Sequence, residues 1–245
     1  MNLRYVTCSD PRPDTSVADA MQFLLTYPMA ELAVQVHNTK VAPGSDRYAW
    51  FDQLVSLATQ ITEPVNLAMH VNLDWCHMLC QGQVPSALAD WLNARHVDGR
   101  PLVRRIQINM AGSQTRVFDA HAVADMIRHY GAQEFIMQYT PMVDTYIKAL
   151  KRTGAKFSVL YDASGGTGRA PVKIDPPFTD VISTGYSGGI GPDNVVVRLN
   201  RIRDVAADAP IWIDAEGRLK SPDTGNFDLK LAERYVRRAT LVAQR

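Results

Sequence analysis

The sequence predicts an α/β protein of the (β/α)8 TIM-barrel class, in which eight parallel strands alternate with helices. Apolar, β-rich runs alternate with segments of helical period almost throughout the chain. There are eight such repeats in 245 residues, a length that suits one closed barrel. No linker, low-complexity run or block of charge divides the chain, so residues 1–245 are expected to form a single domain. An open, doubly wound parallel sheet fits the same pattern, because periodicity does not reveal closure.

The elements follow in order along the chain. The strands are expected at residues 3–7, 31–36, 65–71, 102–110, 135–139, 157–161, 180–184 and 211–214. The helices are expected at residues 16–27, 50–60, 84–93, 119–130, 142–152, 192–203 and 228–242. Asp119 is a suitable N-cap, and Gly131 is a suitable stop for the same helix. Residues 169–178 hold three prolines, which predicts a loop or a very short helix in place of a regular one.

The composition narrows the class of function. The formal net charge is +1, which gives no electrostatic reason to expect nucleic acid or a membrane surface as a partner. No stretch is long and apolar enough to cross a bilayer, and the first residues lack the apolar core of a signal peptide. The three cysteines, Cys8, Cys76 and Cys80, do not form a disulfide pattern, so a cytoplasmic location is expected.

Two glycine-rich turns each follow an apolar run. Residues 165–168 come after the sixth predicted strand, and residues 187–191 come after the seventh. Glycine lets backbone N–H groups approach a phosphate without a Cβ atom in the way. Asp162 ends the sixth strand, which places a carboxylate beside the first turn. Together these features favour an enzyme that acts on a sugar phosphate.

The expected position of the site follows from the barrel. In such barrels the chemistry takes place at the carboxyl ends of the strands. Cys8, Asp162, the turn at residues 187–189 and the turn at residues 214–217 all come at these ends. The sequence therefore predicts that they meet in one site.

Three segments of the second half carry a family resemblance. Residues 160–168 read Leu-Tyr-Asp-Ala-Ser-Gly-Gly-Thr-Gly, and residues 187–195 read Ser-Gly-Gly-Ile-Gly-Pro-Asp-Asn-Val. These segments resemble the Leu-Leu-Asp-x-x-x-Gly-Gly-x-Gly and Ala-Gly-Gly-Leu-x-Pro-x-Asn-Val motifs of phosphoribosylanthranilate isomerases. Residues 213–217 are similar to the Asp-x-Ser-Ser-Gly segment of that family. In the first half the resemblance is fainter and rests on residues 6–8, 45–48 and 106–109.

The resemblance implies an Amadori rearrangement of a small phosphorylated aminosugar, as in tryptophan biosynthesis, without a cofactor or a metal. Asp162 would be the general acid and Cys8 the general base. Arg47 would hold the carboxylate of anthranilate, and Gln107 and Asn109 would also contact the substrate. The phosphate would be held by the backbone at Gly166, Gly188, Gly189 and Gly217.

Several residues depart from the family pattern. Val6 and Thr7 precede Cys8 where the family has lysine, and Asn109 replaces a histidine. Glu216 brings a negative charge to the proposed phosphate site. Two alternatives therefore stay open, namely another phosphosugar enzyme such as a lyase or aldolase, and a homologue that binds a phosphorylated ligand without turnover. The oligomeric state is expected to be a monomer or a homodimer.

A second cluster of chemically interesting residues comes at His70, Cys76, His77 and Cys80. The Cys-x-x-x-Cys spacing is looser than that of established zinc sites, and no second pair follows. The segment is therefore interpreted as a helix start or loop with ordinary thiols.

Overall fold

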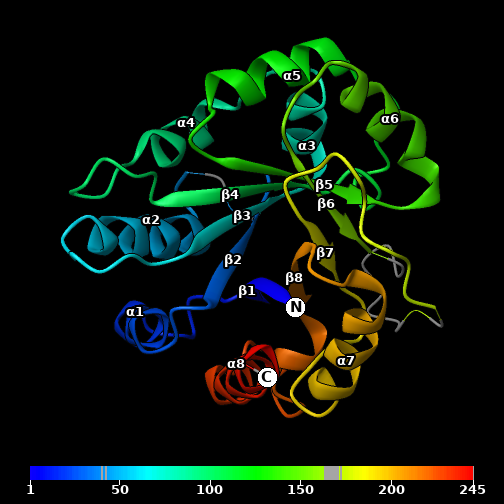
Figure 1. The fold of residues 1–245 in the computed structure, drawn as a ribbon. Coiled ribbons are helices and arrows are strands. Elements are labelled where there is room, and N and C mark those ends of the chain that lie inside the picture. Colours follow the sequence, from blue (N-terminus) through cyan, green and yellow to red (C-terminus); the bar gives the residue numbers. More distant parts are fainter. Residues whose placement is uncertain (40, 42, 163–170, 172, 245) are drawn as a thin grey trace.

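The computed structural model describes residues 1–39, 41, 43–162, 171 and 173–244. Its eight strands form a closed barrel in the order β1 to β8, and all neighbouring strands are parallel (Figure 1). The predicted TIM-barrel class is thereby confirmed. The strands are β1 (Asn2–Ser9), β2 (Ala30–Val36), β3 (Leu67–Val71), β4 (Val103–Ile108), β5 (Glu134–Tyr139), β6 (Ser158–Tyr161), β7 (Thr184–Tyr186) and β8 (Pro210–Ala215).

The helices surround the barrel (Figure 1). They are α1 (Val17–Thr26), α2 (Asp46–Ala58), α3 (Leu73–Leu79), α4 (Ser86–Asn93), α5 (Ala120–His129), α6 (Asp144–Arg152), α7 (Val195–Ala206) and α8 (Leu229–Ala243), with short 3-10 turns η1 (Pro141–Val143) and η2 (Gly217–Leu219). Asp119 caps α5 as predicted, since its carboxylate accepts hydrogen bonds from the first turn. Ser16, Ser45 and Asp228 cap α1, α2 and α8 in the same way.

The predicted elements differ most from the structure in two places, while several other boundaries shift by one to four residues. β7 covers Thr184–Tyr186 and not residues 180–184, because the apolar pair Val181 and Ile182 lies half-buried before the strand begins. Helix α3 has no counterpart among the predicted helix ranges, because its seven residues are too few for a clear helical period and the segment reads only as a helix start or loop. In the described part of the chain no helix lies between β6 and β7, in agreement with the proline-rich segment there.

The large hydrophobic core lies between the strands and the surrounding helices. A second, small apolar cluster consists of Ile136, Leu160 and Trp212, with Tyr5 packed against it. These residues come from four different strands and contact one another, so they fill the inside of the barrel. Gly185 makes room for Trp212, because a Cβ atom at this position would lie 2.2 Å from Trp212 Cε2.

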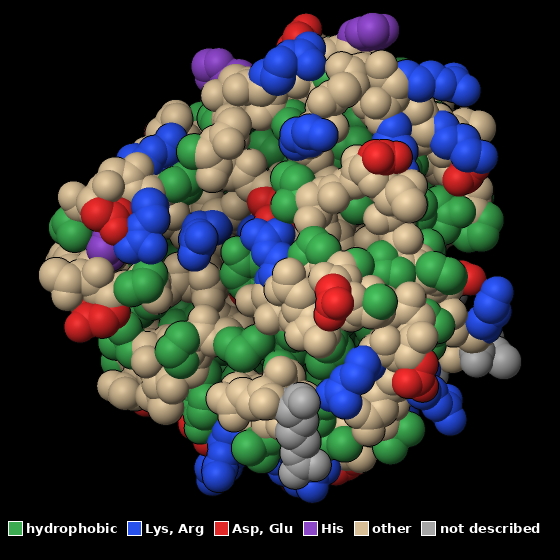
Figure 2. Space-filling view, viewed as in Figure 1, with side chains coloured by type: hydrophobic (Ala, Val, Ile, Leu, Met, Phe, Trp, Pro, Cys, Tyr) green, Lys and Arg blue, Asp and Glu red, His purple; other side chains and the backbone are tan. Residues whose placement is uncertain are grey.

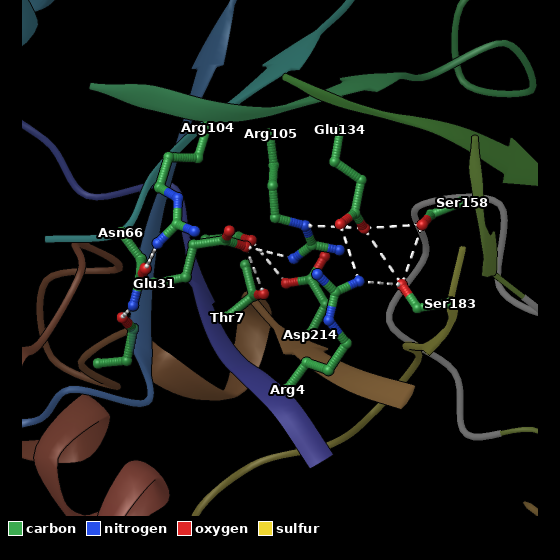
Figure 3. Close-up of polar contacts among 12 residues, drawn as sticks. Arg4, Thr7, Glu31, Asn66, Arg104, Arg105, Glu134, Ser158, Ser183 and Asp214 are labelled. Atoms are coloured by element: carbon green, nitrogen blue, oxygen red, sulfur yellow. Dashed lines mark hydrogen bonds and ion pairs between the residues drawn. The ribbon is translucent and has the colours of Figure 1, made fainter. Parts of the chain in front are cut away.

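A buried charged network also occupies the barrel interior (Figure 3). Arg105 lies between Glu31 and Glu134, with N–O distances of 2.8 Å and 3.4 Å. Its guanidinium also lies 4.2 Å from the ring centre of Trp212 and 4.5 Å from that of Tyr5. Two carboxylates and two aromatic rings therefore hold this cation in position.

The surface carries mixed charge. On the face that Figure 2 shows, Lys and Arg side chains are interspersed with Asp and Glu side chains. Among the described residues no helix has both the length and the apolar character needed to cross a membrane.

Candidate active site

A cavity of about 590 Å³ lies at the carboxyl ends of the strands. Side chains from the ends of β2, β3, β4, β5, β6 and β8 line it, together with the segments that follow β7 and β8. This is the end of the barrel at which the sequence predicts the site. Six of the predicted site residues line the cavity: Asp162, Gln107, Asn109, Gly188, Gly189 and Gly217. Gly166 lies outside the described residues.

Cys8 does not line the cavity. On β1 the hydroxyls of Thr7 and Ser9 reach Glu31 and Asp214 inside the barrel. Successive side chains of a strand point to opposite faces, so Cys8 points out toward the helices and is fully buried there. Burial raises the pKa of the Cys8 thiol well above its ordinary value, and nearby Asp214 and Glu31 add to this. The prediction of Cys8 as the general base is therefore corrected.

Arg47 does not line the cavity either. It lies in the first turn of α2 and donates a hydrogen bond to Asp10, which comes directly after β1. Arg12 and Lys220 contact the same carboxylate. Burial alone would raise the pKa of Asp10, but these three cations lower it. The prediction that Arg47 holds a substrate carboxylate is corrected, because Asp10 already occupies its guanidinium.

Asp214 is the main functional candidate to which the sequence assigned no role. It is the last interior residue of β8, lines the cavity, and accepts a hydrogen bond of 2.6 Å from Ser9 Oγ. Burial raises the pKa of Asp214 to about 7, and the charges of Glu216 and Asp162 act in the same direction. A carboxyl group with this pKa is half ionised near neutral pH, so it suits both proton donation and proton acceptance.

Asp162 follows β6 and is buried at the cavity wall. Gln138 Nε2 donates a hydrogen bond of 2.7 Å to Asp162 Oδ2. The other end of the same amide, Oε1, accepts hydrogen bonds from the backbone of Ala111 and Gly112. The orientation of Gln138 is thus fixed from both sides, and Gln138 in turn positions the carboxylate.

The negative charge of Glu216 is compensated. Lys220 Nζ lies 3.0 Å from Glu216 Oε1, and Gln35 Nε2 donates a hydrogen bond of 2.7 Å to Oε2. Lys220 also contacts Asp10 at 3.1 Å, and the pKa of Lys220 is raised by the two carboxylates although burial opposes this. Glu216 therefore belongs to an ion-pair network at the cavity wall, which lessens its conflict with an anionic ligand.

The turn after β7 and the turn after β8 meet at one side of the cavity. Gly188 and Gly189 both have positive φ (92° and 63°), which explains the two glycines. Asn194 fixes this turn, since its side chain accepts a hydrogen bond from Gly191 N and donates one to Gly189 O. Among the described residues, nothing accepts a hydrogen bond from the N–H groups of Gly188 and Gly189.

Arg218 is a second site residue that the sequence did not single out. It lies in η2, lines the cavity, and packs its side chain against Gly191, where a Cβ atom would lie 2.4 Å from Arg218 Cβ. Within the described residues its guanidinium makes no hydrogen bond or ion pair. Arg218 and the glycine turn together give this side of the cavity the donors and the charge to bind an anion.

The cavity wall formed by β3, β4 and β5 is polar and uncharged. We call it the amide wall and define it as His70, Asn72, Gln107, Asn109 and Gln138. Gln107 donates to Asn109, which donates to Asn72, at 2.7 Å and 2.8 Å. Burial lowers the pKa of His70 to about 4, so the imidazole is neutral at physiological pH.

The cysteine cluster supplies no metal site among the described residues. Cys76 lies on α3, Cys80 follows it, and both thiols are buried and free. Cys76 Sγ lies 3.6 Å from the hydroxyl of Thr115. The sequence indicates a helix start or loop in this segment, and the structure places helix α3 there.

Comparisons with known proteins show a similarity of fold and nothing about function. No family model matches the chain, and no curated protein matches it. A solved structure similar to this chain is the glycoside hydrolase family 30 subfamily 8 xylanase Xyn30A from Clostridium acetobutylicum. The TM-score is 0.52 at 13% sequence identity, over 99% of this chain and 72% of the xylanase chain. The resemblance to phosphoribosylanthranilate isomerase stays a prediction.

Proposed function

We propose that this protein is an enzyme that transfers protons on a small phosphorylated sugar without a cofactor, as in an aldose–ketose or Amadori isomerisation. The observation that carries the proposal is the pair of carboxylates, Asp162 and Asp214, in one cavity at the carboxyl ends of β6 and β8. The two groups interact electrostatically, because Asp162 contributes to the raised pKa of Asp214. Two carboxyl groups in different environments suit a paired acid and base.

In the proposed reaction one group removes the proton from the second carbon of the sugar, and the other protonates the ring oxygen or the first carbonyl oxygen. In the Amadori case protonation of the ring oxygen breaks its bond to the first carbon while the nitrogen lone pair forms a C=N bond. The electron pair of the broken C–H bond then forms a C1–C2 double bond. A proton added to the first carbon and one lost from the second hydroxyl give the ketose or aminoketose, so no redox partner is needed. Asp214 takes the role of general base that the family resemblance implied for Cys8, since burial raises the pKa of its carboxyl group to about 7. Gln138 keeps Asp162 in position for the complementary step.

The anionic end of the substrate is proposed to lie against the Gly188–Gly189 turn and Arg218. The glycine N–H groups, which have no acceptor among the described residues, and the guanidinium supply donors on one side of the cavity. Three free, buried thiols agree with a reducing compartment such as the cytoplasm.

A lyase or aldolase that uses a lysine Schiff base is a weaker second candidate. Lys220 is the one lysine among the described lining residues, and its ammonium group lies between Glu216 and Asp10. These contacts stabilise the protonated form, whereas a Schiff-base lysine must be deprotonated. A carboxylate-only lyase and a binding protein without turnover are separated from the isomerase by experiment.

The test uses deuterium uptake in D2O. The protein is incubated with pentose and hexose phosphates and, separately, with freshly generated phosphoribosylanthranilate, and NMR follows exchange at the second carbon and any cleavage product. Exchange is expected with at least one compound, and Asp162→Asn and Asp214→Asn should each lower it roughly 10²- to 10⁴-fold. Asp223→Asn, an exposed site, is the matched control. Absence of exchange with folded protein, or full activity in both site variants, would contradict the proposal.

A further inference from the structure

The amide wall carries an inference about the substrate that rests on the proposed function. We infer that this wall binds an uncharged, hydroxyl-rich part of the ligand, and that the natural substrate does not place an aromatic carboxylate there. The inference concerns the part of the ligand that lies away from the anion side of the cavity.

The first argument is the chemical character of the wall. Its five residues supply four amides and one imidazole, each of which is neutral and can both donate and accept hydrogen bonds. No Phe, Tyr or Trp is among the described residues that line the cavity. An aromatic ring would therefore cover amide groups and separate them from water without returning hydrogen bonds.

The second argument is the absence of a cation on this wall. Within the described part of the chain the lining cations are Arg218 and Lys220, and both come from the segment after β8. Arg47, which the family resemblance assigned to a carboxylate, is bound to Asp10 outside the cavity. A carboxylate placed against the amide wall would thus lose water without gaining a counter-ion.

The third argument is that hydrogen bonds orient the amides of the wall and yet leave some of its polar groups without a partner among the described residues. Hydrogen bonds run from Gln107 to Asn109, from Asn109 to Asn72 and from Asn72 to the backbone oxygen of His70. This chain fixes which way each amide points. Yet Gln107 Oε1 is buried and accepts no hydrogen bond from the described residues. The His70 ring likewise makes none with them.

These unfilled positions require a partner that donates to an amide oxygen and also pairs with a neutral imidazole. A hydroxyl group does both, because it is a donor and an acceptor at once. A sugar carries several hydroxyls, so the others can pair with the second ring nitrogen of His70 and with the remaining lone pairs of the amide oxygens. The wall therefore suits a polyol or a sugar ring.

The test measures binding to the intact protein, apart from turnover. Ribose 5-phosphate, unphosphorylated ribose, inorganic phosphate and reduced, non-reactive carboxyphenylamino-deoxyribulose phosphate are titrated while ¹⁵N NMR follows the His70 ring. We expect ribose and ribose 5-phosphate to shift the His70 resonances and inorganic phosphate to leave them unchanged. We also expect ribose 5-phosphate to bind more tightly than the anthranilate-derived compound.

Variants of the protein test whether the sugar binds to the amide wall. Gln107→Met, of similar length and without the amide, should weaken ribose 5-phosphate binding about tenfold and leave inorganic phosphate binding unchanged. Gln22→Met on the exposed face of α1 is the control. If Gln107→Met fails to fold, the His70 shifts of the unmodified protein still decide the question.

Tighter binding of the anthranilate-derived compound, or absence of sugar-dependent shifts at His70, would overturn the inference. Sugar binding through the amide wall without any deuterium exchange would instead support the inference and contradict the proposed enzymatic function. The two proposals therefore fail in different experiments.

Discussion

Ser9 and Asp214 join the first and last strands of the barrel through a side-chain hydrogen bond of 2.6 Å. The bond holds the Asp214 carboxyl at the cavity wall, where the group is 7% exposed. Ser9 also stabilises the ionised form, but burial outweighs this contribution. Asp214 is thus held in position while it keeps a pKa that suits proton transfer.

This arrangement predicts a pH-dependent cost to stability. The pKa of Asp214 is raised from 3.8 to about 7. Below pH 4 the carboxyl group is protonated in both the folded and the unfolded protein and does not reduce the free energy of unfolding. As the pH rises from 4 to 7, the unfolded protein loses this proton first, and the free energy of unfolding falls. Asp214→Asn should therefore have little effect at pH 4 and should stabilise the protein at pH 8, by at most about 4 kcal/mol. Urea unfolding between pH 4 and pH 8 measures this difference. Asp223→Asn is the control, and a pH-independent effect of Asp214→Asn would contradict the prediction.

Cys8 lies outside the cavity, whereas the family resemblance implied that it is the general base there. Cys8→Ala should lower the free energy of unfolding by about 1–2 kcal/mol, because it removes a buried sulfur that packs under the helices. Any activity found in the deuterium assay should stay within about twofold of that of the unmodified protein, since the thiol does not reach the cavity. Loss of activity in a folded Cys8→Ala protein would restore Cys8 as the base and overturn the role given to Asp214.

The buried ion pair of Arg105 and Glu31 should be sensitive to the loss of one partner. Both side chains are 1% exposed, so Arg105→Met leaves Glu31 as an unpaired buried charge and should cost about 3–5 kcal/mol. Adding Glu31→Leu to Arg105→Met should recover part of this loss, because it removes the uncompensated charge. Chemical unfolding of the two single variants and the double variant completes the cycle. Asp125→Asn, which breaks an exposed pair with Arg128, should change stability by less than about 0.5 kcal/mol.

The packing of Gly185 against Trp212 predicts a steric effect. Gly185→Ala should destabilise the barrel by about 1–3 kcal/mol, because the new methyl group would overlap a buried aromatic ring. Gly217→Ala is the matched control, since no atom lies within 4 Å of its added Cβ. The melting temperatures of the two variants test this prediction, and equal values would contradict it.

Much of the fold could be predicted because each strand–helix repeat carries its own signal. The exceptions have local causes. Val181 and Ile182 form an apolar pair with strand character, but they lie half-buried before β7 begins at Thr184, and Val181 packs against the core. Gly185 disfavours a strand by propensity, and only its contact with Trp212 explains why a glycine belongs there.

The site could be predicted only in part, for a reason of geometry. The sequence located the carboxyl ends of the strands, and Asp162, Gln107 and Asn109 do line the cavity there. It did not establish which face each side chain takes. On β1 the apolar residues Val6 and Cys8 alternate with the polar residues Thr7 and Ser9. This alternation was a signal that the polar residues face the barrel interior. The burial of Asp214 and the Arg47–Asp10 contact depend on residues far apart in the chain, so no local pattern could reveal them.

The Ser9–Asp214 bond also has a consequence for how the chain acquires its chemistry. The two residues are separated by 205 positions, so their hydrogen bond can form only after β8 has paired with β1. Contacts between residues so far apart in the sequence have a high entropic cost of loop closure, and they tend to form slowly. An incompletely folded chain, with β8 not yet docked on β1, has its carboxyl group in water with an ordinary acidity. Proton-transfer competence would then arise only at the final step of folding, and its appearance during refolding would time the closure of the barrel.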